Sequence, residues 1–490
     1  FDNAHVGKAE CAPSRASMLS GRRNDALRHW GFDRMFRVQN KDLVTLPGRF
    51  RKEGYKTVAV GKIYDGRSFK CAGCEFVDSC STVSSETECS WTETFSNKYI
   101  RDNSHAACGQ SVSFFPGTEF TSKHSLLVLE TQGNASNGLA DTCGTILAIE
   151  KLQELAAGSD DQPFFLAVGY TRPHMPWVCP KEYFDIYRDV PDNDLVAPHE
   201  KIRTPLFFFG PNGLKELQQN NGELKSYGGN NDVREADRIR AYYACTTFID
   251  DEIKKLTDAY NNLSSNVKNN TIIIFWSDHG FHLGDHGLWG KKTVLEQSTH
   301  VPFAIIPPEN FLNLNPGIRE NIGKGVQAPV ESVDIYPTLL DMCGFTIPKD
   351  QLAGTSLVPL LLDTETYVRS AAISQYENWK HKGLMAYSVR TKYHRLIVFP
   401  RVFNKNLPVN VLPYGNPKNI YARLLYDYHF QEPSEGGLRY ETKNRWNSLS
   451  YRSIRTQLIQ IWKSNIDDRD WKNLIGNPPP DANMKIKAIF

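Results

Sequence analysis

The sequence predicts an α/β protein built on a doubly wound, mainly parallel sheet. Short apolar runs with the length of buried strands, at residues 56–60, 164–168, 271–276 and 302–306, alternate with stretches of helical periodicity. Loops rich in Gly, His, Lys and Asp directly follow three of these runs. Functional loops of doubly wound sheets gather at the carboxyl ends of the strands, so we expect these three loops to meet at one edge.

Helices are predicted between the strands by apolar residues that recur every three or four positions. The longest spans about residues 233–260, where one stripe is formed by Ile239, Tyr242, Thr246, Ile249, Ile253, Leu256 and Tyr260. Shorter helices are predicted after residue 11 and at 46–54, 145–155 and 333–342. Their alternation with the apolar runs favours helices on both faces of the sheet.

Beyond about residue 366 the pattern changes. Residues 385–398 contain two runs typical of strands, residues 400–417 are rich in Pro and Asn, and residues 454–462 have the pattern of a late helix. We therefore predict a larger α/β domain at residues 1–365 and a smaller α+β domain at residues 366–490.

Composition excludes several broad classes of partner. The net charge of +2 over 490 residues gives no general argument for nucleic-acid binding. No apolar run approaches the roughly 20 residues that span a bilayer, so no membrane partner is predicted. The chain begins at Phe1 without Met or a signal peptide, and we interpret it as a mature protein or as a fragment whose beginning is missing.

Cysteine usage predicts an oxidising compartment. Six of the ten cysteines fall in one polar region: Cys71, Cys74, Cys80, Cys89, Cys108 and Cys143. Residues 66–143 show little periodicity, so we predict a disulfide-tied insertion there; zinc is the alternative, but the Cys71 and Cys74 spacing has no matching second pair. Sequons at Asn134, Asn262 and Asn269 agree with a secretory route.

The segment from Cys11 to Arg22 concentrates reactive chemistry. Pro13 and Ser14 predict a helix start with Ser14 as its cap, which would put Cys11 just ahead of a helix N-terminus. Such a position favours anions, and the Arg15 guanidinium is suited to binding oxyanions. For a lone Cys beside an Arg, the simpler interpretation is a buried structural cysteine before an ordinary helix.

Four further positions follow strands or turns. Taken singly, three of these residues have simple structural interpretations. Lys62 would be a solvated turn residue, His174 a packed loop residue and Lys291 a surface charge. The adjacent Asp278 and His279 are more informative, because a carboxylate beside an imidazole at a strand end is a plausible metal site.

Together these segments resemble the sulfatase family. Cys-x-Pro-Ser-Arg with its Leu and Gly-Arg tail matches the sulfatase signature. Gly-Lys-Ile-Tyr at 61–64, the run leading to Arg-Pro-His at 172–174 and the long loop at 277–291 follow in the order found in the iduronate-2-sulfatase-like branch. The resemblance runs from residue 3 to about 365, leaves the insertion uncovered, and implies an alkaline-phosphatase-like fold.

The resemblance implies a sulfuric ester hydrolase acting on sulfated sugars such as those of glycosaminoglycans. Cys11 would be oxidised to formylglycine by the formylglycine-generating enzyme, and its hydrate would attack sulfur. Arg15 and a Ca²⁺ ion would orient that nucleophile, with Asp278, His279 and the residue-11 side chain among the metal ligands. A lysosomal or extracellular location is expected from the same branch.

The sulfate itself would be surrounded by three side chains. The resemblance assigns this role to Lys62, His174 and Lys291, and either His174 or Lys291 would assist departure of the sugar oxygen. Fixed cations suit this chemistry, because the transferred sulfuryl oxygens keep negative charge in the transition state.

Two departures from the family pattern matter. The family supplies two adjacent aspartates from a first strand that would lie before Phe1, so we expect the 490-residue chain alone to lack metal ligands and activity. Asp65 stands where the family has His; it either points away, pairs with Lys62 or Arg67, or lowers activity. Phosphate or phosphonate ester hydrolysis and a sulfated-glycan-binding pseudoenzyme remain as alternative functions.

Overall fold

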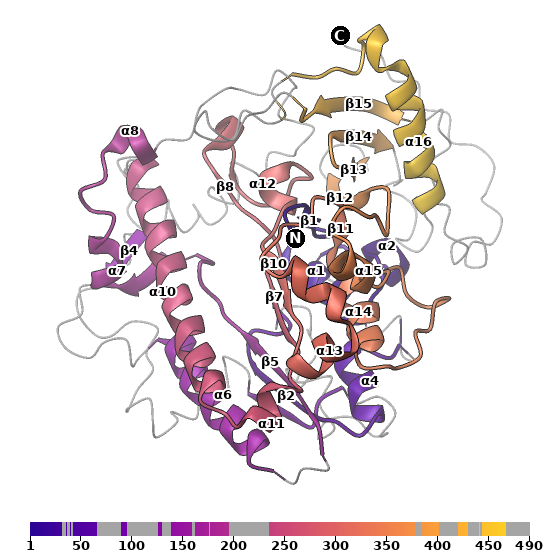
Figure 1. Cartoon of the computed structure of the whole chain (residues 1–490). Helices are drawn as coiled ribbons and strands as arrows, with labels where there is room; N and C mark the ends of the chain where they lie inside the picture. Colours follow the sequence, from indigo (N-terminus) through magenta and orange to yellow (C-terminus); the bar gives the residue numbers. More distant parts are fainter. Residues whose placement is uncertain are drawn as a thin grey trace.

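Strand β2 (Lys56–Gly61) lies at the centre of the N-terminal half of the molecule. It pairs in parallel with β3 (Glu93–Phe95) on one side and β5 (Phe164–Gly169) on the other (Figure 1). The side chains of Val58 and Val60 are fully buried, as expected for a β-branched strand covered on both faces. The register pairs Gly61 with Gly169, so both strands end at the same level.

The computed structural model describes residues 1–31, 36, 40, 43–65, 90–95, 126–129, 139–158, 162–175, 177–195, 235–378, 384–400, 420–429, 441 and 443–466. Most of the predicted 66–143 insertion, Asn134 and Arg67 therefore lie outside the described residues. Cys143 lies within them and takes part in a disulfide bond, whereas Cys11, Cys179, Cys245 and Cys343 are free thiols.

The remaining strands form short ladders on either side. β1 (Ala4–His5) pairs in parallel with β11 (Val330–Glu331), and β4 (Leu126–Leu129) with β6 (Trp177–Pro180). Antiparallel pairs join β7 (Ile273–Trp276) to β10 (Phe303–Ile306) and β8 (His282–Leu283) to β9 (Trp289–Gly290). The prediction of an α/β protein with mainly parallel strands is confirmed, and the pairs β7–β10 and β8–β9 are antiparallel additions to it.

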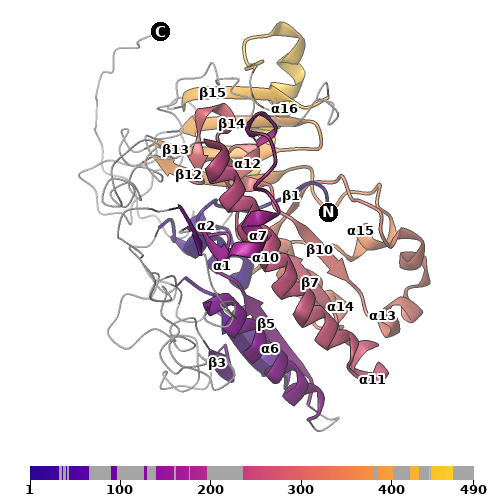
Figure 2. The ribbon, with the colours of Figure 1, turned by 90° about the vertical axis from the view of Figure 1, so that its left-hand side faces the viewer.

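Helices cover both faces of these strands. α6 (Ala140–Ala156) lies along β5 and packs against α10 (Glu235–Asn261), as Figure 2 shows. α1 (Cys11–Ser20), α4 (Leu46–Lys52) and α14 (Ile335–Met342) lie on the opposite side of the strands in Figure 1. This confirms the doubly wound arrangement.

Smaller elements complete the same region. Short helices are formed by Asn24–Leu27 (α2), Lys181–Asp185 (α7), Asp192–Leu195 (α8), Ser265–Lys268 (α11), Glu296–Thr299 (α12), Glu309–Leu314 (α13) and Val358–Leu362 (α15). Single 3-10 turns lie at Asp285–Gly287, Pro316–Asn321, Ser332–Asp334 and Leu449–Tyr451.

The long helix α10 buries a wider face than its sequence stripe predicts. Ile239 and Ile249 are buried as expected, but Thr246 is exposed, and Cys245 and Phe248 are fully buried outside the predicted stripe. The reason is that the first half of α10 contacts β6 and α7 as well as α6, so that a second side of the helix is covered.

A cavity of about 1200 Å³ separates β5 from β7. The later part of the α10 stripe, through Ile253 and Leu256, lines it together with both strands. Among the described strands, β5 pairs only with β2 and β7 only with β10, so the edges that face the cavity have no strand partner in that part of the chain. Both strands end near the same end of this cavity, where the motif loops begin.

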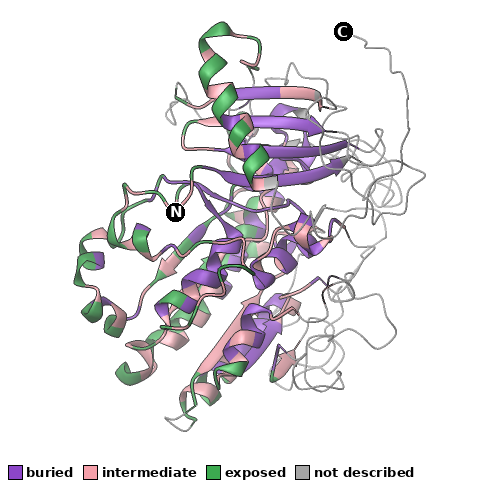
Figure 3. Ribbon diagram, turned by 90° about the vertical axis from the view of Figure 1, so that its right-hand side faces the viewer, coloured by how far each residue is buried: buried purple, intermediate pink, exposed green. Residues whose placement is uncertain are grey.

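A four-stranded antiparallel sheet forms the C-terminal part. Its order is β12 (Ala372–Asn378), β13 (Leu384–Arg390), β14 (His394–Pro400) and β15 (Ile420–Asp427), with α16 (Arg452–Ile466) packed on one side. Figure 3 shows the buried strands and the exposed outer face of α16. The predicted strands within 385–398 and the late helix are confirmed; β12 and β15 were not predicted.

This sheet contacts the segment that leads into α1. The backbone N–H of Gln375 donates to Gly7 O at 2.8 Å, and Ser374 Oγ donates to Val6 O at 2.7 Å. The C-terminal sheet therefore supports the start of the signature helix directly. Within the described residues, no helix has the length and apolar character needed to cross a membrane.

Candidate active site

The signature helix begins at Cys11 itself, three residues earlier than the predicted cap at Ser14. Pro13 occupies the first turn, where a missing N–H costs nothing, and the Ser14 N–H donates to Glu10 O at 3.0 Å. Ser14 is buried inside the helix and does not cap it. The helix ends at Gly21, whose φ of 65° favours glycine. Cys11 is thus held rigidly in the first helical turn.

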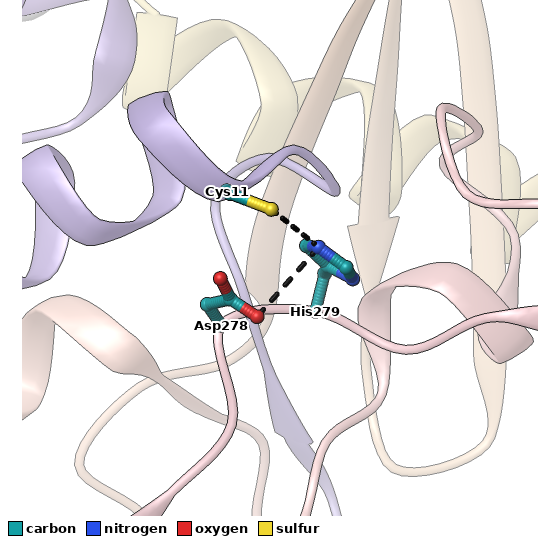
Figure 4. Close-up of side chains that lie close together, drawn as sticks. All are labelled: Cys11, Asp278 and His279. Carbon is teal, nitrogen blue, oxygen red and sulfur yellow. Dashed lines mark hydrogen bonds and ion pairs between the residues drawn. The ribbon is translucent and has the colours of Figure 1, made fainter. Parts of the chain in front are cut away.

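Two groups from distant loops contact the Cys11 thiol. His279 Nε2 lies 3.2 Å from Sγ, and Lys291 Nζ donates to Sγ at 3.3 Å (Figure 4 shows the first of these contacts). Burial by itself raises the pKa of this thiol, and Asp278 does the same, but the charges of Lys291, Lys62 and His279 lower it to about 6. Cys11 therefore sits in a buried, electropositive site that stabilises an anion.

Arg15 connects the helix to the other loops. Its Nε donates to Asp278 Oδ2 at 2.7 Å, and its Nη1 donates to the carbonyl oxygens of Lys62 and Ile63, the latter at 3.1 Å. The guanidinium thus joins three segments far apart in the chain. Its described hydrogen bonds go to these groups and not to Cys11, so its position suits orientation of the site.

Asp278 and His279 follow β7 as predicted. Burial opposes ionisation of Asp278, yet Arg15, His279 and the two nearby lysines hold its pKa well below its usual range. His279 Nδ1 lies 2.9 Å from Gly280 O, which leaves Nε2 facing Cys11. A Cβ at Gly280 would lie 2.0 Å from Gln297 O, so glycine permits the close approach that fixes this loop.

Lys62 comes from the end of β2, and Asp65 lies beside it. Lys62 Nζ is 3.5 Å from Asp65 Oδ2, and Asp65 is buried. Of the predicted possibilities for Asp65, the structure places it against Lys62. The ends of β2 and β5 can approach closely because Gly169 has no side chain. A Cβ at this position would lie 2.1 Å from the carbonyl oxygen of Lys62.

His174 is half-buried in the loop after β5, with Nδ1 2.6 Å from Met175 O. This loop is held by Asp141 of α6, which accepts hydrogen bonds from the N–H groups of Thr171 at 2.6 Å and Arg172 at 3.3 Å. Sequence reasoning missed Asp141. Asp141 falls within the predicted insertion at residues 66–143, some thirty residues earlier, and gave no signal that it would contact this loop.

All seven predicted site residues line the same cavity: Cys11, Arg15, Lys62, His174, Asp278, His279 and Lys291. Three of them, Cys11, Asp278 and His279, have possible metal-donor atoms that all lie within 4.8 Å of one another. His174 lines the cavity without a described contact to Cys11. The three strand-end loops and the first turn of α1 therefore meet at one place, as the fold predicts.

The metal donors present here do not complete a calcium site. Ca²⁺ takes about six to eight oxygen ligands. The described residues offer one carboxylate that is already bonded to Arg15, one imidazole and the residue-11 side chain. This donor set is too small and too poor in oxygen to hold calcium by itself.

Comparison with known proteins identifies the family. Residues 1–345 match the family model described as Sulfatase, and residues 284–407 match the model described as N-sulphoglucosamine sulphohydrolase, C-terminal. The chain belongs to the sulfatase family. Members of this family generally use formylglycine and a divalent metal.

Individual sulfatases resemble the chain at moderate identity. Iduronate 2-sulfatase of Homo sapiens is 29% identical over 374 residues, which cover 71% of this chain and 63% of that protein. A sulfatase of Formosa agariphila is 29% identical over 408 residues, covering 78% and 69%. The chain thus spans somewhat less than two thirds of the human relative.

Solved structures share the fold. A phosphonate monoester hydrolase from Silicibacter pomeroyi aligns with a TM-score of 0.63 at 19% identity, covering 96% of this chain and 88% of that one. A 2-O GAG sulfatase aligns with a TM-score of 0.59 at 17% identity, covering 98% and 87%. At these identities the similarity concerns the fold, which is the predicted alkaline-phosphatase-like one.

Proposed function

We propose that this sulfatase removes sulfate from sulfated sugars, with a formylglycine made from Cys11 as its nucleophile. The observation that carries the proposal is the convergence of His279 and Lys291 on the Cys11 sulfur, in a cavity also lined by Lys62 and His174. The similarity to iduronate 2-sulfatase supports an iduronate-type or related glycosaminoglycan sugar as substrate.

The chain's own cations bind and orient the sulfate. When residue 11 is formylglycine, its hydrate supplies the hydroxyl that displaces the sugar oxygen from sulfur. Lys291, 3.3 Å from Sγ, and Lys62 stabilise the sulfuryl oxygens that surround the reacting atom. Arg15 and Asp278 hold the first turn of α1 against the β7 loop, so that residue 11 keeps its direction.

His174 is the group that we assign to the leaving oxygen. Its Nδ1 faces the Met175 carbonyl, so Nε2 is the nitrogen that exchanges a proton with the departing sugar oxygen. Lys291 is the alternative proton donor to the leaving oxygen. Its hydrogen bond to Cys11 places its ammonium group beside the nucleophile, which suits it better to stabilising that group. Asp65 beside Lys62 reduces the positive charge available to the sulfate.

Asp278, His279 and the residue-11 side chain are too few and too poor in oxygen to hold Ca²⁺ tightly by themselves. Isothermal calorimetry on the 490-residue chain should detect only weak Ca²⁺ binding. Tight binding by this chain would contradict the expectation.

A secretory location, lysosomal or extracellular, and maturation by the formylglycine-generating enzyme belong to the same proposal. The disulfide at Cys143 supports an oxidising compartment. The electropositive surroundings of the Cys11 thiol and its rigid position in the first helical turn suit a modified side chain that must hold an anion.

The test uses protein produced from its complete coding sequence and secreted by cells that contain the formylglycine-generating enzyme. Mass spectrometry of the residue-11 peptide should find formylglycine, and sulfated disaccharides should be hydrolysed, with Cys11→Ala as the inactive control. Faster turnover of aryl phosphate or a phosphonate ester than of aryl sulfate would favour the alternative hydrolase. Unmodified Cys11 with glycan binding that persists in Cys11→Ala would establish the pseudoenzyme.

A further inference from the structure

A second group of metal-binding side chains lies in the C-terminal sheet, away from the candidate active site. His394 at the start of β14 and Asp427 at the end of β15 are direct cross-strand partners, and His429 follows two residues later. The donor atoms of these three residues all lie within 4.8 Å of one another. Two of the three are therefore fixed by a sheet register and not by a loop.

The distances suit a small ion. Asp427 Oδ1 lies 2.8 Å from His429 Nδ1 and 3.9 Å from His394 Nε2. A tetrahedral zinc ion with bonds of about 2.0 to 2.1 Å needs neighbouring donors roughly 3.3 to 3.5 Å apart. The observed separations lie on either side of this value, so small side-chain rotations bring the three donors to a common centre.

Surrounding groups orient the donors. Tyr451 donates its hydroxyl hydrogen to Asp427 Oδ2, which leaves Oδ1 as the oxygen that faces both imidazoles. The Tyr393 ring stacks on His429, with centroids 4.2 Å apart and planes at 19°. Metal ligands are commonly held by outer hydrogen bonds of this kind.

Burial and exposure also fit a metal ligand set. The side chains of His394 and Asp427 are largely buried, with exposed fractions of 13% and 6%. The His429 side chain is 42% exposed, which gives an ion a path from solvent and an open fourth position.

We propose that His394, Asp427 and His429 form a zinc-binding site that joins β14 to the end of β15. Two imidazoles and one carboxylate suit zinc, whereas calcium needs more oxygen ligands. Binding replaces the hydrogen bond between His429 Nδ1 and Asp427 with two metal bonds, and the Nδ1 proton of the imidazole passes to Nε2. The site is independent of sulfate hydrolysis, since none of its residues lines the active-site cavity.

The experiment is zinc titration of the metal-free protein, followed by elemental analysis and thermal unfolding. Because the candidate active site also holds Cys11 and His279, His279→Ala serves to remove that competing site. We expect one zinc equivalent to remain in His279→Ala and to disappear when His429→Ala is added to that variant, with a zinc-dependent rise in Tm that the double variant lacks. Co²⁺ added in place of zinc should give the visible absorption of a tetrahedral site.

Two further variants distinguish zinc binding at this specific site from weak zinc binding to exposed histidines in general. Tyr451→Phe should weaken zinc affinity by about 10- to 100-fold without removing a ligand. His300→Ala removes a histidine of similar exposure, 40%, and should leave the stoichiometry unchanged. Equal zinc binding by His429→Ala and the unmodified protein, or equal loss in His300→Ala, would overturn the proposal.

Discussion

Arg15 Nε donates to Asp278 Oδ2 at 2.7 Å, and this ion pair joins the first turns of the signature helix to the loop after β7. Because the guanidinium also donates to the carbonyl oxygens of Lys62 and Ile63, it joins α1 to two strand-end loops, the one after β2 and the one after β7. Arg15 therefore acts on residue 11 through the loops that it positions.

Lys291→Met should raise the pKa of the Cys11 thiol from about 6 towards its ordinary value. Burial already favours the neutral thiol, and Lys291 is the strongest of the charges that outweigh it. The rate of iodoacetamide alkylation against pH, measured on protein with unmodified Cys11, reports this midpoint. Lys292→Met is the control, since Lys292 pairs with Glu10 at 3.6 Å and not with Cys11. An unchanged midpoint in Lys291→Met would contradict the electrostatic account.

The sequence predicted most of the sheet and its loops, because buried strands such as 56–60 and 164–168 are continuous apolar runs whose ends are marked by polar motifs. The predicted helix cap, Ser14, lies four residues after the observed cap, Glu10. Pro13 and Ser14 both suit a first turn, and the helix begins instead at Cys11, which packs beside His279 and Lys291. Such long-range contacts leave no local signal.

The candidate site was predicted as a set of residues but not as a set of contacts. Their positions after strands predicted that Lys62 and Asp278 would lie near one another. The bridge that Arg15 forms between their loops was not predictable, because it joins distant segments. The same holds for the hydrogen bonds by which Asp141 holds the His174 loop. The buried Cys245 and Phe248 of α10 were missed for the same reason, since β6 and α7 cover a face that periodicity alone leaves exposed.

Asp65→Asn should increase sulfatase turnover. The Asp65 carboxylate lies 3.5 Å from Lys62 and partly neutralises the positive charge that the lysine offers to the sulfate. Removing the carboxylate charge should therefore stabilise the negatively charged transition state more strongly. We expect kcat/KM to rise about tenfold, equivalent to roughly 1.4 kcal/mol. Asp65→Glu keeps the charge and serves as the control. If both variants match the unmodified enzyme, Asp65 does not limit the reaction.

Glu296→Gln should make the free energy of unfolding less dependent on pH in the acid range. Burial raises the pKa of this carboxyl, but Arg390 and Arg395 hold it well below its usual range. A depressed folded-state pKa contributes stability that is present above about pH 4.3, the unfolded value, and is lost as pH falls through the folded pKa. At pH 7 the variant should lose about 3 to 5 kcal/mol of unfolding free energy, because buried Arg390 loses its carboxylate partner and Arg395 keeps only Glu441.

Urea unfolding at pH 7 and at stepwise lower pH measures this effect. The exposed Glu309, paired with Arg319, supplies the control Glu309→Gln, whose unfolding free energy should stay nearly unchanged. A Glu296→Gln curve parallel to that of the unmodified protein across the acid range would show that another carboxyl controls acid unfolding.

Gly169→Ala should damage both stability and catalysis, because the two strand ends that carry Lys62 and the His174 loop meet at this glycine. An added Cβ would lie 2.1 Å from the Lys62 carbonyl oxygen, which also accepts a hydrogen bond from Arg15. Separating β2 from β5 here should cost about 1 to 3 kcal/mol and move Lys62 out of position. Gly317→Ala, whose Cβ would meet Leu362 at an ordinary 3.8 Å, is the control. Urea unfolding and kcat/KM should therefore change together in Gly169→Ala alone; loss of stability with unchanged kcat/KM would show that Lys62 does not depend on this contact.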